Sequence, residues 1–324
     1  MDISDPDAFN EASKDLITRY SQSDALCLNI ANSIWMNGDN TSQNFSDAFK
    51  EVVTDFYHGD VRTTADGKAA AEVNAWVSEK TKGKIPYILE EGSDFVAMLV
   101  NAIYFKGAWL HEFGEGATAP DEFTSGDGSK VQLDFMNKTK WLSYGDTRSV
   151  RMVELPYKNR VDKVSETGEY LDTEVYDDLN ISMYLIDAEG DVNVEQELNA
   201  AIADGLFRST YVRLSVPKFR IEYETSLNDS LKALGIRSAF DGGRADFQRM
   251  FDSGNMWFSD TIHKTYIEVD EKGTEAAAVT AIGMMTSARP SQPVELKFNK
   301  PFYFVIRDNI SGETLFMGRY AYGK

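Results

Sequence analysis

Three segments in the first third of the chain carry apolar residues at helical spacing. The first follows Asp5, a residue type that caps helices, and Pro6, which fits a first helical turn. The third segment, residues 71–80, ends before Gly83. The sequence therefore predicts three helices, the first two with apolar faces made of Ala8, Phe9, Ala12, Leu16 and Tyr20 and of Phe45, Phe49, Val52, Val53 and Phe56.

Strand patterns become more frequent toward the C-terminus. Residues 95–105, FVAMLVNAIYF, form a continuous apolar run that is typical of a strand covered on both faces. Leu26, Leu28 and Ile30 alternate with other residues, as in a half-buried strand. Further strands are predicted at residues 181–186, 212–216, 266–269, 302–306 and 315–317. No linker or repeat separates the helical part from the strand part, so the sequence predicts one α+β domain over residues 1–324.

The chain of 324 residues carries 52 acidic and 33 basic side chains, which gives a formal net charge of −19. This negative charge opposes binding to nucleic acids and to anionic membranes, so neither is predicted as a partner. The single cysteine, Cys27, excludes an internal disulfide. The N-terminal residues are acidic and lack the apolar core of a signal peptide, which leaves a cytoplasmic location open.

Residues suited to catalysis or metal binding are scarce. The sequence has His58, His111 and His263 as its histidines and holds no HExxH, CxxC, GxSxG, P-loop or GxGxxG motif. A Ser-His-Asp site stays open, because such triads are defined by geometry. The stretch 125–130 lacks EF-hand spacing and is predicted to be a hairpin turn. We therefore predict no enzyme activity, no catalytic residue, no metal site and no cofactor.

Residues 271–290, EKGTEAAAVTAIGMMTSARP, are small for a chain rich in large apolar side chains. A helix is disfavoured, because Val279 and Thr280 are β-branched and Gly283 follows. A solvated linker is one interpretation. A strand is the other, because at period two one face holds only uncharged residues, namely Thr274, Ala276, Ala278, Thr280, Ile282 and Met284. The segment is therefore able to be a loop or a buried strand.

Several motifs resemble those of one protein family. Residues 100–113, VNAIYFKGAWLHEF, and residues 298–308 and 315–320, FNKPFYFVIRD and LFMGRY, are similar to two serpin signatures. Residues 268–281, EVDEKGTEAAAVTA, resemble the reactive-loop hinge of inhibitory serpins. Shorter matches in the order of the family are NAWVSEKTKGKI at 74–85, SVPKF at 215–219 and IHK at 262–264. The resemblance extends from about residue 5 to the C-terminus.

The resemblance implies a fold of three β-sheets with about eight or nine helices, in which a central five-stranded sheet accepts the reactive-centre loop as a sixth strand. It implies an irreversible inhibitor, because a serine protease cleaves the loop, forms its acyl-enzyme and is trapped when the cut loop inserts. The inhibitor would be a monomer, extracellular, and bound covalently to its protease. Heparin is not predicted as a partner, since residues 5–20 are acidic. A non-inhibitory serpin acting as a carrier or chaperone is the alternative.

At positions that match the serpin motifs, the resemblance implies roles in conformational change and not in catalysis. Glu271 and Lys218 resemble the pair where the loop begins to insert, with Trp109 nearby. Asn101 and His263 resemble the polar cluster beneath the centre of the sheet, which explains a lone amide in an apolar strand. The hinge is assigned to Glu271, Gly273, Thr274, Glu275, Ala276, Ala277 and Ala278.

The reactive-centre loop and the strand after it are assigned to residues 271–297. Counting from the hinge places the scissile bond at Ser287–Ala288, which suits an elastase-like or subtilisin-like protease. Counting back from Phe298 places it at Arg289–Pro290, which suits a trypsin-like enzyme, although proline after the bond makes a poor substrate. Serpins usually carry several helices and a strand before the position that matches residue 5. We therefore expect either a truncated chain or a divergent short form that lacks these helices.

Overall fold

The computed structural model describes residues 5–21, 26–41, 43–65, 67–147, 149–165, 170–188, 190, 192–251, 255–274 and 292–322. Contacts between residues divide the chain into two compact units. The first comprises residues 1–22, 27–105 and 221–267, and the second comprises residues 23–26, 106–220 and 268–324. Each unit is described by itself.

The first unit begins with the three predicted helices, α1 (Pro6–Ser21), α2 (Asp47–Tyr57) and α3 (Ala69–Lys80). The hydroxyl of Ser46 caps α2 by accepting a hydrogen bond from the backbone N–H of Phe49. Helix α2 ends at His58, which adopts the left-handed conformation. The remaining elements are β1 (Leu26–Met36), β2 (Asp60–Thr63), β3 (Ala97–Ala108), β11 (Phe219–Ser226), α5 (Asn228–Ala233) and β12 (Phe258–Val269).

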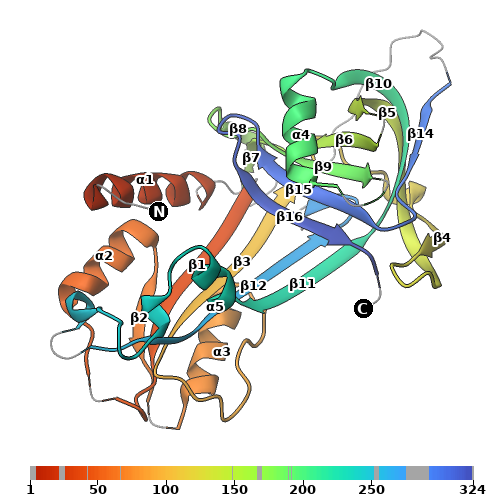
Figure 1. Ribbon diagram of the computed structural model, residues 1–324. Helices are drawn as coiled ribbons and strands as arrows, with labels where there is room; N and C mark the ends of the chain where they lie inside the picture. The colour runs from red at the N-terminus through yellow and green to blue at the C-terminus, as the bar shows by residue number, and fades with distance from the viewer. Residues whose placement is uncertain are drawn as a thin grey trace. The chain divides into compact units, whose positions relative to one another are not determined.

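These strands form a sheet in the order β11-β12-β3-β1-β2 (Figure 1). The pairs β1–β2 and β12–β3 are parallel. Strand β3 contains the apolar run of residues 97–105 and is the middle strand of this order, as its two-sided burial requires. Helix α3 covers β1, β3 and β12 through a core that includes Val73, Trp76, Ala31, Val100 and Ile262.

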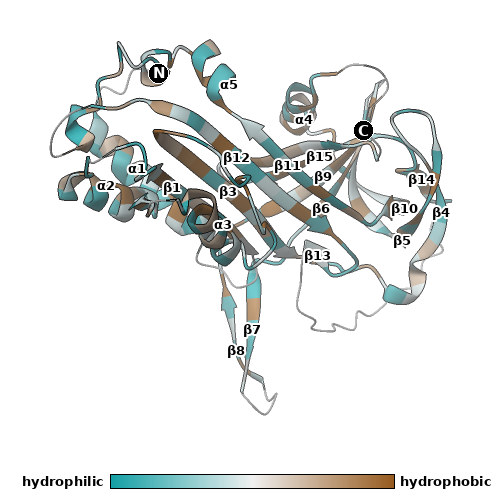
Figure 2. Ribbon diagram, turned by 90° about the horizontal axis from the view of Figure 1, so that it is seen from below, coloured by the Kyte–Doolittle hydropathy of each residue, from teal (hydrophilic) through white to brown (hydrophobic). Residues whose placement is uncertain are grey.

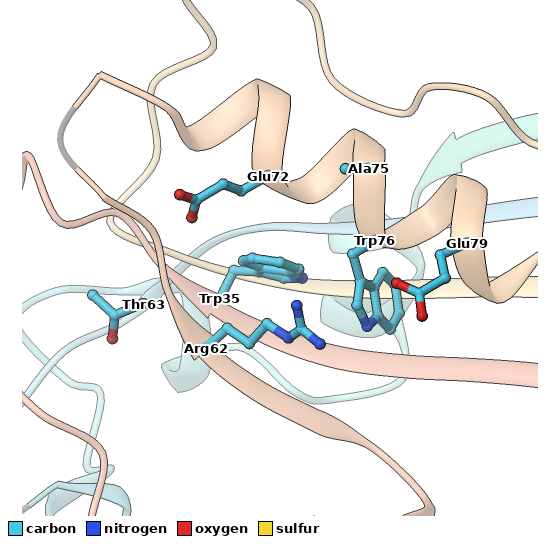
Figure 3. Close-up of a pocket in the computed structure, with 7 residues that line it drawn as sticks. All are labelled: Trp35, Arg62, Thr63, Glu72, Ala75, Trp76 and Glu79. Carbon is cyan, nitrogen blue, oxygen red and sulfur yellow. The ribbon is translucent and has the colours of Figure 1, made fainter.

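Helix α3 is anchored to β1 and β2 by two nearly buried indoles. Trp35 and Trp76 meet edge to face with ring centres 6.0 Å apart, and the Trp76 indole N–H donates to Asp60. Burial alone would raise the pKa of Asp60, but hydrogen bonds from Trp76 and Lys80 outweigh it and lower that pKa. Figure 3 shows Arg62 beside Trp35 at a surface hollow of about 450 Å³.

The second unit is mostly β-structure. Its largest sheet has the order β14-β10-β5-β6-β9-β15-β16, with β4 paired to β5. Helix α4 packs on β6, β9 and β15 through Val194, Leu198 and Ala201, as Figure 1 shows. The elements are β4 (Ala119–Thr124), β5 (Lys130–Asp146), β6 (Val150–Pro156), β7 (Arg160–Val164), β8 (Tyr170–Val175), β9 (Ile181–Ala188), α4 (Val194–Ala203), β10 (Arg208–Pro217), β13 (Gly273–Thr274), β14 (Val294–Lys297), β15 (Phe302–Asp308) and β16 (Thr314–Tyr320).

The predicted α+β class and the three-sheet fold are confirmed, because the third sheet is the two-stranded pair β7–β8. The predicted hairpin turn at residues 125–130 joins β4 to β5 and contains Gly128 at φ 84°. Within its described ranges the chain has five α-helices, fewer than the eight or nine that the resemblance implied. Across the same ranges no helix has both the length and the apolar character needed to cross a bilayer.

Candidate functional site

The first residues of the predicted hinge form a short strand in the second unit. Strand β13 pairs antiparallel with the end of β3, so that Gly273 faces Ala108 and Thr274 faces Gly107. The Thr274 side chain is fully buried, and its hydroxyl lies 2.9 Å from the phenolic oxygen of Tyr157. A threonine fits here because the β-branched side chain favours a strand and the hydroxyl finds a buried partner.

Gly273 lies where the space beside the backbone excludes any side chain. A Cβ atom at this position would lie 2.0 Å from the carbonyl oxygen of Gly107 and 2.8 Å from the Cα atom of Ala108. The backbone also has a φ of 150°. The close approach of the two strands and the positive φ therefore both require glycine at this position.

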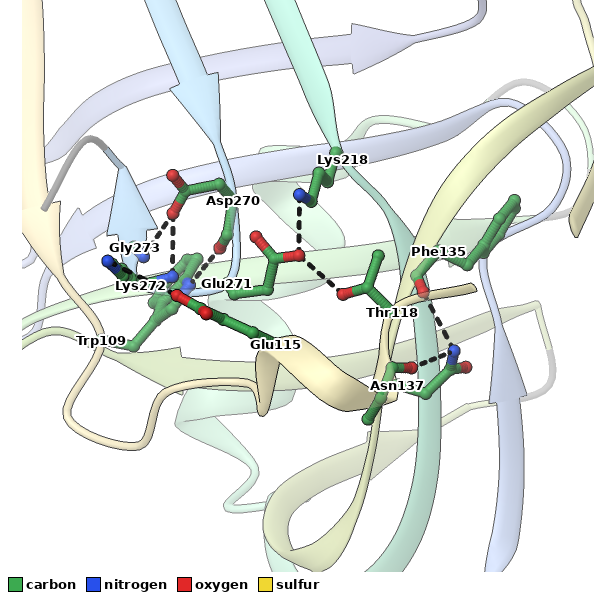
Figure 4. A network of polar contacts seen from close by, with 11 residues as sticks. Trp109, Glu115, Thr118, Phe135, Asn137, Lys218, Asp270, Glu271, Lys272 and Gly273 are labelled. Atoms are coloured by element: carbon green, nitrogen blue, oxygen red, sulfur yellow. Dashed lines mark hydrogen bonds and ion pairs between the residues drawn. The ribbon is translucent and has the colours of Figure 1, made fainter. Parts of the chain in front are cut away.

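Glu271 holds the segment just before β13. Its Oε1 atom accepts hydrogen bonds from the Lys218 ammonium at 2.7 Å and from the Thr118 hydroxyl at 2.6 Å, as Figure 4 shows. Its backbone carbonyl accepts a hydrogen bond from the N–H of Phe113 at 2.8 Å. Burial alone would raise the pKa of the Glu271 carboxyl, but the bonds from Lys218 and Thr118 hold that pKa below its ordinary value.

Trp109 supports the same segment from β3's end. Its indole N–H donates to the backbone carbonyl of Asp270 at 3.0 Å (Figure 4). Its backbone N–H donates to the backbone carbonyl of Lys272 at 2.9 Å. The indole stacks on Tyr157 with ring centres 4.5 Å apart. Burial raises the pKa of Tyr157, so the phenol that meets Thr274 stays protonated.

Acid should weaken the hinge through Glu271. The carboxylate has a lower pKa in the folded chain than its ordinary 4.5, so its stabilisation is complete above that value and is lost as the pH falls through the folded pKa. We expect Glu271→Gln to cost about 1–3 kcal/mol at pH 7 and progressively less toward pH 3 in paired thermal melts. Glu115→Gln, at an exposed carboxylate 3.5 Å from Lys272, is the control and should cost little. A pH-independent cost for Glu271→Gln would contradict this linkage.

A polar cluster lies between β12 and β3 in the first unit. His263 and Asn101 are direct neighbours in the parallel register, and His263 Nδ1 lies 2.7 Å from Asn101 Oδ1. The Asn101 amide donates to Asn32 Oδ1 at 2.7 Å, and Asn32 in turn donates to the carbonyl of Tyr57 at 3.2 Å. Burial lowers the pKa of His263, which favours the neutral ring. The lone amide of the apolar strand is thus hydrogen-bonded on both of its polar atoms.

Comparison with known proteins decides the family. Residues 1–322 match the model of the family described as serpin (serine protease inhibitor). The chain belongs to the serpin family. Serpin-Z1C of Triticum aestivum is 36% identical over 292 residues, which are 84% of this chain and 69% of that protein. A leukocyte elastase inhibitor of Xenopus laevis is 33% identical over 314 residues, which are 91% of this chain and 77% of that protein.

Solved serpin structures share the fold. Native tengpin, a thermophilic serpin, superposes with a TM-score of 0.77 at 28% identity and covers 97% of this chain and 78% of its own. Native protease nexin-1, solved with heparin, superposes with a TM-score of 0.77 at 25% identity and covers 98% of this chain and 83% of its own.

The structure brings together some of the residues that the sequence singled out in this serpin. Glu271, Lys218 and Trp109 meet around the hinge, and Asn101 meets His263. The sequence analysis missed Tyr157, Thr118 and Asn32. No local motif marks these residues, and their hydrogen bonds to the site join residues far apart in the sequence. The hinge positions Glu275, Ala276, Ala277 and Ala278 and both proposed scissile bonds, Ser287–Ala288 and Arg289–Pro290, lie outside the described residues.

Lys138, on β5, is a cation near the hinge of this serpin. Its ammonium donates to the carbonyl of His111 at 2.9 Å and lies 3.6 Å from the ring centre of Phe113. Burial, followed by repulsion from Lys140, lowers the pKa of Lys138 to about 7.

Removal of the Lys138 charge should therefore stabilise the protein below pH 7. The unfolded lysine keeps its proton up to about pH 10.5, so stability rises with pH between 7 and that value. We expect Lys138→Met to melt about a few degrees higher than the parent at pH 6, with the gain vanishing near pH 10. Lys130→Met, which removes an exposed lysine paired with Glu122, should show no such gain. A lower melting temperature for Lys138→Met at pH 6 would contradict the assignment.

Proposed function

We propose that this serpin is an irreversible inhibitor of serine proteases that acts as a suicide substrate. The protease serine attacks the carbonyl carbon of Ser287, and the amine of Ala288 leaves with a proton. The resulting ester is trapped when the cut loop enters the sheet before water can hydrolyse it. An elastase-like or subtilisin-like target fits the small residues around this bond, and a trypsin-like enzyme acting at Arg289 is the alternative. In this role the protein is a partner of an enzyme in the extracellular space and is not itself a catalyst.

One observation carries this proposal, namely the pairing of β13 with β3. The edge of β3 beside Gly107 already accepts Gly273 and Thr274 as a strand, and Thr274 is fully buried there. The next inward positions in the sequence are Ala276 and Ala278, which are small and uncharged. Insertion can therefore continue from β13 without burying a charge or a large side chain.

Two polar groups are suited to control how far the strand extends. The Glu271–Lys218 pair holds the chain at the start of β13, and the Asn101–His263 contact joins β3 directly to β12 farther along. A strand that enters between β3 and β12 must separate the parallel register of these two strands. We therefore assign Lys218, Trp109, Asn101 and His263 to control of sheet opening.

Covalent trapping is the direct test of this function. The protein is incubated with elastase-like, subtilisin-like and trypsin-like proteases, and a complex that survives SDS is sought on gels. Mass spectrometry of the released C-terminal peptide then locates the cleaved bond. We expect a covalent complex with at least one of these proteases and a new N-terminus at Ala288. Complete cleavage without any covalent complex would overturn the proposal and favour a non-inhibitory serpin.

Heparin should not accelerate inhibition. Helix α1 carries Asp7, Glu11 and Asp15 against Lys14 and Arg19, so it repels a polyanion. The association rate with a target protease, measured with and without heparin, is therefore expected to stay the same within about twofold. A rate increase that disappears at high salt would contradict this prediction and would align the protein with the heparin-bound protease nexin-1.

A further inference from the structure

The β7–β8 pair is a two-stranded ribbon that leaves apolar side chains uncovered. Its strands pair with each other in a sheet of their own, and Figure 2 shows them extending away from the other strands of the second unit. Tyr170, Leu171 and Val175 are 65%, 63% and 51% exposed. A ribbon of this size has marginal stability by itself, so exposed apolar residues on it are better explained by a partner than by folding.

Both faces of the ribbon carry paired polar groups and exposed apolar side chains. On one face Lys163 forms an ion pair with Glu174 at 2.8 Å. Leu171 and Val175 share the opposite side of β8 with Thr173, because side chains two and four positions apart point the same way, and the Thr173 hydroxyl donates to Asp162 at 2.7 Å. Tyr170 shares the side of Glu174, so exposed apolar side chains occur on both faces, beside polar groups that are paired within the ribbon.

The root of the ribbon lies at the hinge. Tyr157, which bonds to Thr274 and stacks on Trp109, lies three residues before the start of β7. The next residue, Lys158, donates its backbone N–H to the carbonyl of Ala108, the residue that pairs with Gly273. The ribbon is therefore rooted beside Ala108, the residue of β3 that pairs with β13.

The ribbon segment is strongly acidic. Residues 158–178 hold seven acidic side chains and three basic ones. The acidic residues are Asp162, Glu166, Glu169, Asp172, Glu174, Asp177 and Asp178, and the basic ones are Lys158, Arg160 and Lys163. Such a segment attracts a basic surface and accelerates its approach, and the attraction falls with ionic strength.

We propose that the β7–β8 ribbon is a docking surface for the target protease, and that it selects proteases with a basic surface and an apolar patch beside the active site. The inference rests on the proposed inhibitory function, because the protease is the partner that this function assigns to the chain. The acidic side chains steer the approach, and Leu171 and Val175 provide the contact that is buried on docking. The ribbon thereby adds specificity that the small residues around Ser287 cannot supply.

The test compares association rates for a protease that forms the covalent complex with the parent protein. Leu171→Thr combined with Val175→Thr places a β-branched residue, which favours strands, at both positions and removes the apolar contact. We expect its association rate constant to fall about tenfold, with the stoichiometry of inhibition unchanged because the hinge is untouched. The matched control replaces Tyr223 and Leu234, which are also exposed but lie in the first unit, by threonine, and its rate should equal the parent rate.

A charge variant keeps the test decisive if the threonine variant disturbs the ribbon. Asp172→Lys should slow association and flatten its dependence on salt, whereas an unchanged rate and salt slope would overturn the inference.

Covalent complexes that form at equal rates in parent and variants would overturn the docking surface while the inhibitory function stands. Absence of any covalent complex with the parent protein would instead overturn the function itself. Light scattering could instead show a concentration-dependent dimer that both variants abolish, while their association rates with the protease stay unchanged. The ribbon would then bind a second copy of the chain, and the inference would be overturned.

Discussion

Thr274→Arg is expected to convert the inhibitor into a substrate. The Thr274 side chain is fully buried against β3, and its hydroxyl meets Tyr157 in a site where burial also raises the pKa of that phenol. An arginine at this position would bury a guanidinium without a carboxylate or would expel β13 from the sheet, and expulsion costs less. The loop would then be cleaved as before, but its insertion would be delayed long enough for water to hydrolyse the acyl-enzyme.

The measurement is the stoichiometry of inhibition together with the yield of SDS-stable complex. We expect the stoichiometry to rise about tenfold or more, because hydrolysis of the acyl-enzyme would then be faster than insertion. Thr274→Ser keeps the hydroxyl and should behave like the parent protein. An unchanged complex yield for Thr274→Arg would exclude insertion through β13 as the trapping step.

Cleaved protein is expected to melt well above intact protein. Strand β13 contributes two residues to the pairing with β3, and cleavage near Ser287 would let the residues that follow Thr274 extend it. If roughly ten residues each gain about 0.5–1.5 kcal/mol in net hydrogen bonding, insertion contributes ~10 kcal/mol before the entropy of ordering is subtracted. Even a part of this gain should raise the melting temperature by about 10 °C.

Paired melting curves of intact and nicked samples test this expectation. The nick removes no residue, so any gain must come from rearrangement of the cut chain. Nicked Thr274→Arg is the control, because a chain that cannot keep β13 in the sheet should gain much less. Coincident curves for the intact and nicked parent protein would contradict the mechanism.

Local sequence patterns predicted the elements but not the contacts that join them. The apolar run of residues 95–105 and the helical spacing in residues 5–20 depend on neighbours in the chain, and both elements formed where expected. Tyr157 and Thr274 are 117 residues apart, and Thr118 and Glu271 are 153 residues apart. Such pairs are fixed by strand register, which no single segment encodes. Only the resemblance to serpin motifs pointed to Lys218 and His263 in advance.

The β7–β8 ribbon escaped prediction for a related reason. Its strands are largely exposed on both faces, so the alternation of apolar and polar residues that marks a half-buried strand is weak. Pairing between the two strands, for example Val161 with Glu174, is visible only in the structure.

The stacked pair of Trp109 and Tyr157 gives the protein an internal optical reporter. The indole ring lies 4.5 Å from the phenol ring that touches Thr274, and its N–H is bonded to Asp270 at the start of the hinge. Entry of further loop residues must alter the polarity and packing around this ring. The emission of Trp109 therefore follows strand insertion in real time without an attached dye. A variant that keeps Trp109 and replaces the other four tryptophans by phenylalanine would isolate its signal in stopped-flow fluorescence.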